Sequence, residues 1–488
     1  MNKKQISKRN RFFTWTWQGC LLLGVAGFLM TSCAGDGFAD ESFVPGNGVT
    51  NTQLVSPSAD DITITPSADG SKQEIAWPLV YGAGGYQAIL TNLTTDEVMV
   101  DSIIDGLSFI VNREEDTNYQ LDLKVLGNEK LGNTAGEMVS KAFTTFSESN
   151  GTIANGTDLY EYFQTNPVPD PQEGAETDEF IFDLVSNGEY TISQPLDFNY
   201  HKVTLRTADK ANHATITLAT DANFVASNDL TLKYVDIDAS ATSQPVITLY
   251  KYDTDPDGIL EKPKNYYLIN YIRLMDCNIK GVNGSLVYDN NKSYCVMTFM
   301  LKNCVIQMNT TTANIKNESW ISFQGGGVKD FSASNTTVYQ TGEGQPKYFL
   351  RYNNSVRVDR ITGSTADYTT MNYTNCTFYK VNSGQWANYS GISNYTTYTI
   401  SKNIWVDCGD GATARRIMGN GRLGNNATAT WSYNTYWLNG AQCDQGDYDN
   451  GGSVLTTDPA FENAENGDFT PTGADQVTNR TGDLRWFE

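Results

Sequence analysis

Basic residues are few in this sequence. The 488-residue chain has 34 Lys and Arg against 56 Asp and Glu, which gives a formal net charge of −22. Such a surface repels phosphate backbones, so the composition excludes nucleic acid as a partner. Histidine is rarer still. The two histidines, His201 and His213, form no HExxH motif, which excludes a zincin site and disfavours a Ser-His-Asp triad.

Strong helix formers are also scarce. Gly (42 residues) and Tyr (27 residues) are abundant together with Asn and Thr, and this composition favours strands and turns over helices. No apolar run after residue 30 approaches the length that crosses a bilayer. We therefore expect an all-β protein. It is too long for one compact core, so it should form two or more domains or an elongated repeat array.

The first thirty residues have the pattern of an export signal. A basic stretch ends at Arg11, and an apolar run over residues 21–30 leads through two small residues to Cys33. This order is similar to a bacterial lipobox, whose cysteine is lipidated and becomes the mature N-terminus. An uncleaved anchor is the alternative, because residues 12–30 are about long enough to span a bilayer.

The lipobox pattern predicts a signal peptide over residues 1–32, lipidation of Cys33 and a polar tether over residues 33–59. The mature protein would then be held in the bacterial outer membrane by its lipid alone. The small and acidic residues after Cys33 resemble the start of surface-exposed lipoproteins of the Bacteroidetes. That resemblance implies a location facing the cell exterior.

Residues 60–147 alternate period-2 strands with turns at a spacing of about ten residues. Trp77 and the segments 86–90 and 119–125 resemble the B, C and F strands of a fibronectin type III domain, with Tyr119 at the tyrosine-corner position. The resemblance implies a β-sandwich with Trp77 at its centre. Modules of this kind usually act as spacers.

From residue 156 to residue 488 the organising feature is a repeat. Seven short segments, spaced 27 to 42 residues apart, have mostly apolar or small residues at their second and fourth positions. The segments begin at Tyr234, Asp276, Asn303, Asn335, Asn375, Asn403 and Asn434. Such alternation is typical of strands with one buried face. The period and the single recurring strand type predict a right-handed parallel β-helix.

In a stack of coils, equivalent positions of successive repeats lie above one another. The alignment places Cys277, Cys304 and Cys376 in an interior column, and it places the leading Asn and Asp residues in a ladder at the turn before each strand. An exported chain permits disulfides as the alternative for these cysteines. Their alignment with apolar and small residues of other coils favours free, buried thiols.

Three C-terminal motifs carry a family resemblance. Residues 457–461 (TDPAF), 466–469 (NGDF) and 482–486 (GDLRW) are similar to the closing segment of a group of Bacteroidetes surface lipoproteins and of several β-helical polysaccharide lyases. Members of that group join a fibronectin type III module to a right-handed parallel β-helix, and their domains are often described only as domains of unknown function. The resemblance implies a polysaccharide ligand, for example a pectin-like one, and glycan-uptake machinery as a partner.

Lys329 and Arg351 are the candidate catalytic residues of a Ca²⁺-assisted polysaccharide lyase. Elimination from a uronic acid needs a base and cations that stabilise the developing enolate, and a separation of 22 residues, about one coil, would make the two neighbours. The coil before Lys329 offers only Glu318 as a carboxylate. This favours a basic patch that binds an anionic glycan without catalysis. Glycoside hydrolysis would need clustered aspartates on adjacent strands, and we do not expect it here.

Calcium is the only cofactor that the sequence suggests. Asp253, Asp255 and Asp257 supply oxygen ligands at alternating positions before a glycine turn, a pattern that suits Ca²⁺. The flanking helices of an EF-hand are not expected. An acidic turn in a solvated loop is therefore the alternative interpretation.

A glycan-binding surface needs aromatic faces for sugar rings and polar groups for sugar hydroxyls. We expect these from aromatic residues of the later coils, with Trp405 and Tyr436 facing outward, and from two cations. The candidate glycan-binding residues are Trp386, Tyr389, Trp405, Tyr436, Lys347 and Arg357. Packing of the aromatic side chains over the sheet is the alternative.

The sequence therefore predicts a lipid-anchored cell-surface protein that binds a polysaccharide as a non-catalytic accessory to glycan uptake. A polysaccharide lyase is one alternative. An adhesin or scaffold with a protein partner is the other.

Overall fold

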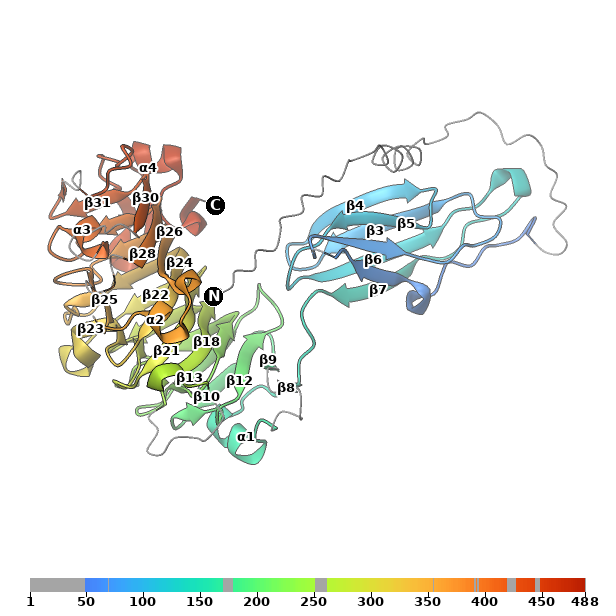
Figure 1. Cartoon of the computed structure of the whole chain (residues 1–488). Coiled ribbons are helices and arrows are strands. Elements are labelled where there is room, and N and C mark those ends of the chain that lie inside the picture. Colours follow the sequence, from blue (N-terminus) through green and yellow to red (C-terminus); the bar gives the residue numbers. More distant parts are fainter. Residues whose placement is uncertain are drawn as a thin grey trace, which may run out of the picture.

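The computed structural model describes residues 49–487 except 69, 170–178, 251–260, 354, 390–391, 393–394, 419–426 and 444–447. Antiparallel sheets form its N-terminal part, and long parallel sheets consistent with a β-helix form the rest (Figure 1). None of the helices in this part of the chain is long and apolar enough to cross a membrane.

Two antiparallel sheets, of order β1-β2-β5 and β4-β3-β6-β7, form the N-terminal sandwich. Their strands are β1 (Thr63–Pro66), β2 (Lys72–Ala76), β3 (Tyr86–Asn92), β4 (Glu97–Ile104), β5 (Ser108–Asn112), β6 (Asn118–Val125) and β7 (Val139–Thr144). Leu121 and Leu123 alternate inward on β6 and share one buried cluster with Trp77, which confirms the predicted core. The hydroxyl of Tyr119 accepts a hydrogen bond from the N–H of Glu114 at 3.2 Å.

A short helix, α1 (Leu159–Thr165), begins the second part of the chain. The Asp158 carboxylate caps it by accepting a hydrogen bond from the N–H of Tyr160 at 2.9 Å. Leu159 and Phe163 are its buried face and join the long core of the parallel stack. The helix therefore covers the apolar end of the stack that the first coils would otherwise expose.

The largest sheet in the described part of the chain has 18 strands, which form two ladders of parallel strands. The first ladder runs through β9 (Glu179–Leu184), β12 (Lys202–Thr207), β15 (Leu230–Lys233), β18 (Tyr267–Met275), β21 (Tyr294–Lys302), β24 (Gly327–Gln340), β26 (Thr369–Tyr379), β28 (Thr396–Ser401) and β30 (Thr428–Ser432). The second runs through β10 (Glu189–Ile192), β13 (Ala214–Leu218), β16 (Val235–Asp238), β19 (Asn278–Val282), β22 (Val305–Met308), the later halves of β24 and β26, β29 (Ile404–Val406) and β31 (Thr435–Leu438). Two short strands extend the sheet, β8 (Gly151–Ile153) and β32 (Ala441–Gln442).

In the described part of the chain, a separate seven-stranded parallel sheet completes each coil except the last two. Its strands are β11 (Leu196–Asp197), β14 (Phe224–Ala226), β17 (Ile247–Leu249), β20 (Val287–Tyr288), β23 (Ser319–Phe323), β25 (Tyr348–Tyr352) and β27 (Ala387–Asn388). Each strand pairs with its counterpart one coil further on. Side chains from all three faces meet in one continuous core.

A residue in the left-handed backbone conformation marks the corner between the first and second ladders. Seven such residues with φ between 45° and 56° stand there, namely Tyr234, Asp276, Asn303, Asn335, Asn375, Lys402 and Tyr433. Asn and Asp adopt this conformation more readily than other L residues, which explains the leading residues of the sequence repeat. The Asn303 amide also donates to the Asp276 carboxylate at 2.9 Å. The predicted ladder is confirmed for the four coils that lead with Asp or Asn.

The last two coils are shifted by one residue relative to the sequence alignment. Lys402 and Tyr433 take the corner, so Asn403 and Asn434 move to the next position, inside the stack. There the Asn403 side chain accepts a hydrogen bond from the N–H of Cys376 at 3.0 Å, and the Asn434 side chain accepts one from the N–H of Asn403 at 3.1 Å. A buried amide ladder thus continues the cysteine column.

The predicted interior thiols are confirmed. Cys277, Cys304 and Cys376 are fully buried and form no disulfide. The three other cysteines of the described chain form no disulfide either. Burial raises the pKa of Cys376 above its ordinary value. These thiols therefore act as small apolar core residues.

The C-terminal segment folds back over the outer face of the second ladder. It contains β33 (Phe461–Asn463), β34 (Asp468–Pro471), α4 (Ala474–Asn479) and the 3₁₀ turn Leu484–Phe487. Phe469 packs on Ile404 and Val406, and the buried Asp483 accepts a hydrogen bond from the Thr337 hydroxyl at 2.9 Å. Two further short helices, α2 (Val358–Thr362) and α3 (Thr413–Ile417), lie in loops between strands.

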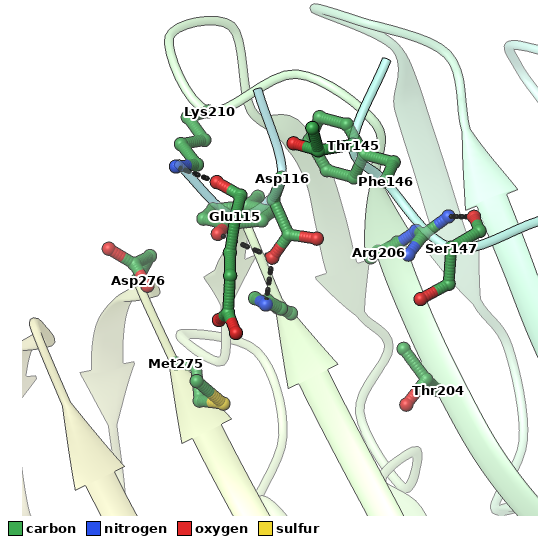
Figure 2. A network of polar contacts seen from close by, with 12 residues as sticks. Glu115, Asp116, Thr145, Phe146, Ser147, Thr204, Arg206, Lys210, Met275 and Asp276 are labelled. Carbon is green, nitrogen blue, oxygen red and sulfur yellow. Dashed lines mark hydrogen bonds and ion pairs between the residues drawn. The ribbon is translucent and has the colours of Figure 1, made fainter. Parts of the chain in front are cut away.

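Polar contacts join the sandwich to the first ladder, and Figure 2 shows them. The Asp116 carboxylate accepts hydrogen bonds from the Lys233 ammonium and, at 3.1 Å, from the Tyr234 hydroxyl. The Lys210 ammonium donates to the Glu115 carbonyl at 2.6 Å. Asp116 and Lys233 are only 11% and 17% exposed. The sandwich is therefore docked on the stack by a mostly buried ion pair.

Candidate functional site

The outer face of the seven-stranded sheet carries a column of side chains contributed by successive coils. Strand register aligns Val225, Thr248, Tyr288, Ser322, Arg351 and Asn388. Their neighbours along each strand point inward and are buried. We define the polar strip as the middle of this column with the loop residues beside it, namely Thr248, Tyr288, Asn291, Asn317, Ser322, Lys347 and Arg351.

A cavity of about 550 Å³ lies at one end of the polar strip. Two tyrosines, Tyr250 and Tyr288, line it with Lys316 and with amide side chains that include Asn223, Gln244 and Asn290. Both tyrosines are half-buried. Aromatic faces beside amide groups are the combination that sugar rings and their hydroxyls need.

Hydrogen bonds between side chains continue the polar strip away from this cavity. The Asn291 amide donates to the Tyr288 hydroxyl at 3.1 Å. The Asn317 amide donates to the Asn291 side-chain carbonyl at 2.8 Å and to the Ser322 hydroxyl at 2.9 Å. The Asn317 backbone carbonyl in turn accepts from Arg351 Nη1 at 2.8 Å. The cavity and the arginine therefore belong to one connected surface.

Two cations lie at the other end of the polar strip. Lys347 Nζ and Arg351 Nη1 approach the Glu318 carboxylate at 3.9 Å and 3.4 Å, and both lie over the ring of Tyr348. A side-chain hydrogen bond to Tyr348, followed by the charge of Glu318, raises the pKa of Lys347 above its ordinary value. Lys347 therefore carries a positive charge at neutral pH, and the guanidinium group of an arginine is always charged in proteins, so the two add positive charge to a chain that is acidic overall.

The structure does not bring Lys329 and Arg351 together. Lys329 lies on β24 of the large sheet, where its ammonium pairs with Asp330 at 2.9 Å and with Asp367 at 3.8 Å. Arg351 lies on β25 of the other sheet. The expectation that one coil of separation makes them neighbours is wrong, because the two positions fall on different sides of the coil.

The four aromatic residues predicted to bind glycan are buried, so that prediction is wrong for them. Trp386 and Trp405 are 1% exposed, Tyr436 is 2% exposed and Tyr389 is fully buried. Trp405 stacks between Phe378 and Tyr436, at 5.6 Å and 5.1 Å between ring centroids.

The one-residue shift of the last two coils causes the error for Trp405 and Tyr436. Because side chains alternate across a strand, a shift of one residue moves each of them from the outer to the inner face. The other two aromatics are fixed by interior contacts. Trp386 stacks on Phe349 with 4.3 Å between ring centroids, and the Tyr389 hydroxyl donates to the Ile417 carbonyl at 2.6 Å.

The two predicted cations have different surroundings. Lys347 is 49% exposed and belongs to the polar strip. Arg357 lies apart from it at the start of α2, where its Nε donates to the Asp359 carboxylate at 3.0 Å and its guanidinium stacks 3.3 Å from the ring centroid of Tyr395. Arg357 is already paired and stacked, so it has less to offer a ligand.

Other predicted sites lie outside the described residues. These are the lipidation site Cys33 and the calcium ligands Asp253, Asp255 and Asp257. Within the described chain, no group of three or more His, Cys, Asp or Glu side chains is placed to hold a metal ion. Lipidation and calcium binding remain predictions from the sequence.

A second polar surface lies on the outer face of the second ladder. Asp236 Oδ1 lies 2.9 Å from Nδ1 of His213 and accepts from the Asn278 amide at 2.8 Å, while Asp238 pairs with Lys280 at 3.0 Å. A cavity of about 290 Å³ opens beside both carboxylates. Asp236 and Asp238 are not among the predicted site residues, although two aspartates two residues apart on a repeat strand are a pattern visible in the sequence.

Both carboxylates are held in their ionised form. Burial alone would raise the pKa of Asp236, but hydrogen bonds from His213 and Asn278 lower it below its ordinary value. Burial is likewise outweighed at Asp238, where hydrogen bonds from Ser240 and from Lys280 lower the pKa. A glycosidase needs one carboxylic acid with a raised pKa. Neither Asp236 nor Asp238 has a raised pKa, so the two do not match the carboxyl pair of a glycosidase.

Comparison with known families gives three successive matches, each to a domain of unknown function. Residues 7–187 are similar to DUF4992, residues 188–341 to DUF4957 and residues 371–486 to DUF5123. The first match ends within the parallel stack, between β9 and β10. No curated protein matches the chain.

One solved structure with similarity to the chain is a family 28 exopolygalacturonase of Yersinia enterocolitica. Sequence identity is 10%, the match covers 78% of this chain and 76% of that one, and the TM-score is 0.14. At this level the likeness carries no argument about function.

Proposed function

We propose that the chain binds a polysaccharide along the polar strip and acts as a non-catalytic accessory to glycan uptake. One observation carries the proposal: a cavity lined by tyrosines and amides is connected to Arg351 by a continuous set of hydrogen bonds, and Lys347 lies beside that arginine at Glu318. Tyr250 and Tyr288 offer ring faces, and the amides offer donors and acceptors for hydroxyls.

The stacked coils suit a polymeric ligand. Equivalent positions of successive strands lie about 4.8 Å apart, so Thr248, Tyr288 and Arg351 follow one line along the stack, with the buried Ser322 in the coil between Tyr288 and Arg351. A chain of sugars lying along this line would contact several coils at once. A small ligand would occupy the cavity alone.

The setting of this binding surface belongs to the same proposal. In this proposal Cys33 is lipidated and anchors the protein in the outer membrane. The polysaccharide, for example a pectin-like one, reaches the polar strip from the cell exterior. We also take the sandwich as a fibronectin type III-like module, supported by its strand order and by Tyr119, and the stack as a right-handed β-helix. The sandwich would hold the polar strip away from the membrane.

Binding assays with defined oligosaccharides test the proposal. The full-length protein should bind at least one plant or bacterial polysaccharide, and Tyr288→Ala and Arg351→Ala should each weaken that binding about ten-fold, the order expected for losing one stacking or charge contact. Lys280→Ala is the matched control, because it removes an exposed cation from the other surface. Equal losses in all three variants would contradict the proposal.

The same assays separate binding from lyase chemistry. Ultraviolet absorbance reports the unsaturated end that an elimination creates. We expect no such product from the wild type with or without Ca²⁺. A product that disappears in Lys329→Ala or Arg351→Ala while binding survives would show that these residues act on the transition state, and the non-catalytic proposal would be wrong.

A further inference from the structure

Glu318 lies where a ligand carboxylate would make its strongest contacts. Its two oxygens face Lys347 Nζ and Arg351 Nη1 at 3.9 Å and 3.4 Å. Charge-assisted hydrogen bonds are normally shorter, at about 2.7 to 2.9 Å. Glu318 therefore partly neutralises the two cations without saturating them.

Arg351 has one hydrogen-bond donor that is not used within the described part of the chain. Its Nη1 binds the Asn317 carbonyl, but its Nε is buried and has no hydrogen-bond partner in the described part of the chain. An unsatisfied buried donor costs free energy. A second carboxylate that drew the guanidinium slightly outward would recover part of that cost.

The loop that carries Glu318 is held in an unusual conformation. Asn317 and Glu318 are consecutive left-handed residues, with φ of 51° and 55°. Such a conformation is uncommon for glutamate and persists only where its surroundings fix it. Here the Asn317 amide fixes the loop through Asn291 and Ser322, while the Glu318 side chain stays 58% exposed. The backbone is therefore fixed, while the exposed carboxylate has room to turn into solvent.

We infer that Glu318 is an internal competitor for the carboxylate of an acidic sugar, so that the ligand of the polar strip is a uronate-containing glycan. This inference rests on the proposed function. When the ligand binds, its carboxylate takes the place between Lys347 and Arg351, and the Glu318 side chain turns into solvent. Glu318 thereby sets the strength of binding and excludes weakly charged chains.

A pair of probes tests the inference, a galacturonate oligosaccharide of defined length and its methyl-esterified form. We expect the full-length protein to prefer the free acid, and Glu318→Gln to tighten free-acid binding about two- to five-fold at low salt, the range for one exposed ion pair. Binding of the ester should stay unchanged. Asp238→Asn is the matched control, because it also frees a lysine from an ion pair but on the other surface, and it should change neither affinity.

The outcomes distinguish this inference from the function on which it rests. If the wild type binds both probes equally and Glu318→Gln changes neither, the strip binds glycan but the inference about Glu318 is wrong. If Glu318→Gln weakens free-acid binding, Glu318 supports the site instead of competing, and the inference is again wrong. If neither probe nor any other glycan binds, the proposed function itself fails.

Discussion

Asn303 offers a test of the left-handed corner that recurs in seven coils. It combines two features, a left-handed backbone with φ of 54° and a side-chain hydrogen bond to Asp276 at 2.9 Å. Asn303→Gly removes the hydrogen bond but keeps a residue that adopts this backbone without strain. Asn303→Ala removes the same hydrogen bond and places a Cβ in the left-handed region. The two variants therefore differ mainly in backbone strain.

The magnitudes follow from these two contributions. A hydrogen bond to a charged acceptor contributes about 1.5 to 3 kcal/mol, and less where water can replace the lost partner. An alanine in the left-handed region costs a further 1 kcal/mol or so. We therefore expect Asn303→Gly to lower the free energy of unfolding by about 1 kcal/mol and Asn303→Ala by about 2 kcal/mol.

Calorimetry of the full-length protein, followed through the transition of the parallel stack, measures both losses. Glycine within a regular strand is normally less stable than alanine, so the expected order is the reverse of that at an ordinary strand position. If the alanine variant is as stable as the glycine variant, Asn303 does not occupy a left-handed corner, and the account of the sequence repeat is wrong.

Three further predictions concern the anchor, the core and pH. Cys33→Ala should release the protein from the membrane fraction; retention of the variant in that fraction would exclude Cys33 as the anchor. Trp405→Ala should cost about 3 to 5 kcal/mol of unfolding free energy, as for other buried aromatics, and Trp437→Ala on the opposite face should cost clearly less; equal losses would refute the shifted register. Burial raises the pKa of Asp289 to about 7, so its ionisation should destabilise the fold progressively from about pH 4 to pH 7, by on the order of 4 kcal/mol. Asp289→Asn has no carboxylate to ionise, so its stability should not show this loss. The difference in unfolding free energy between wild type and variant, measured by denaturation at each pH, should therefore shift in favour of the variant over that interval. A constant difference would contradict the assignment.

The sequence repeat was sufficient to predict the parallel stack because stacking repeats the same local demand in each coil. An Asn or Asp at a left-handed corner and an alternating strand after it give a signal that does not depend on distant contacts. Asp276, Asn303 and Asn375 all satisfy it. The same signal failed at Asn403, because the corner residue there is Lys402 and Asn403 stands one position later, buried as part of the amide ladder.

The polar strip could be predicted only in part. Lys347 was recognised by its charge, but its neighbourhood depends on the loop that carries Glu318, whose conformation has no simple sequence pattern. Tyr288 and Asn317 come from different coils and meet through Asn291. The spacing of residues along the chain does not predict such contacts between coils, because loop lengths differ from coil to coil.

The most direct test of the central claim is to map where a bound glycan protects the protein. Hydrogen exchange of backbone amides, measured with and without a bound oligosaccharide, should show slower exchange in residues 287–291, 316–323 and 347–352, which carry all of the polar strip except Thr248. Residues 235–238 and 278–282 on the second ladder should exchange at the same rate in both states. Protection confined to the second ladder, with none on the seven-stranded sheet, would contradict the account.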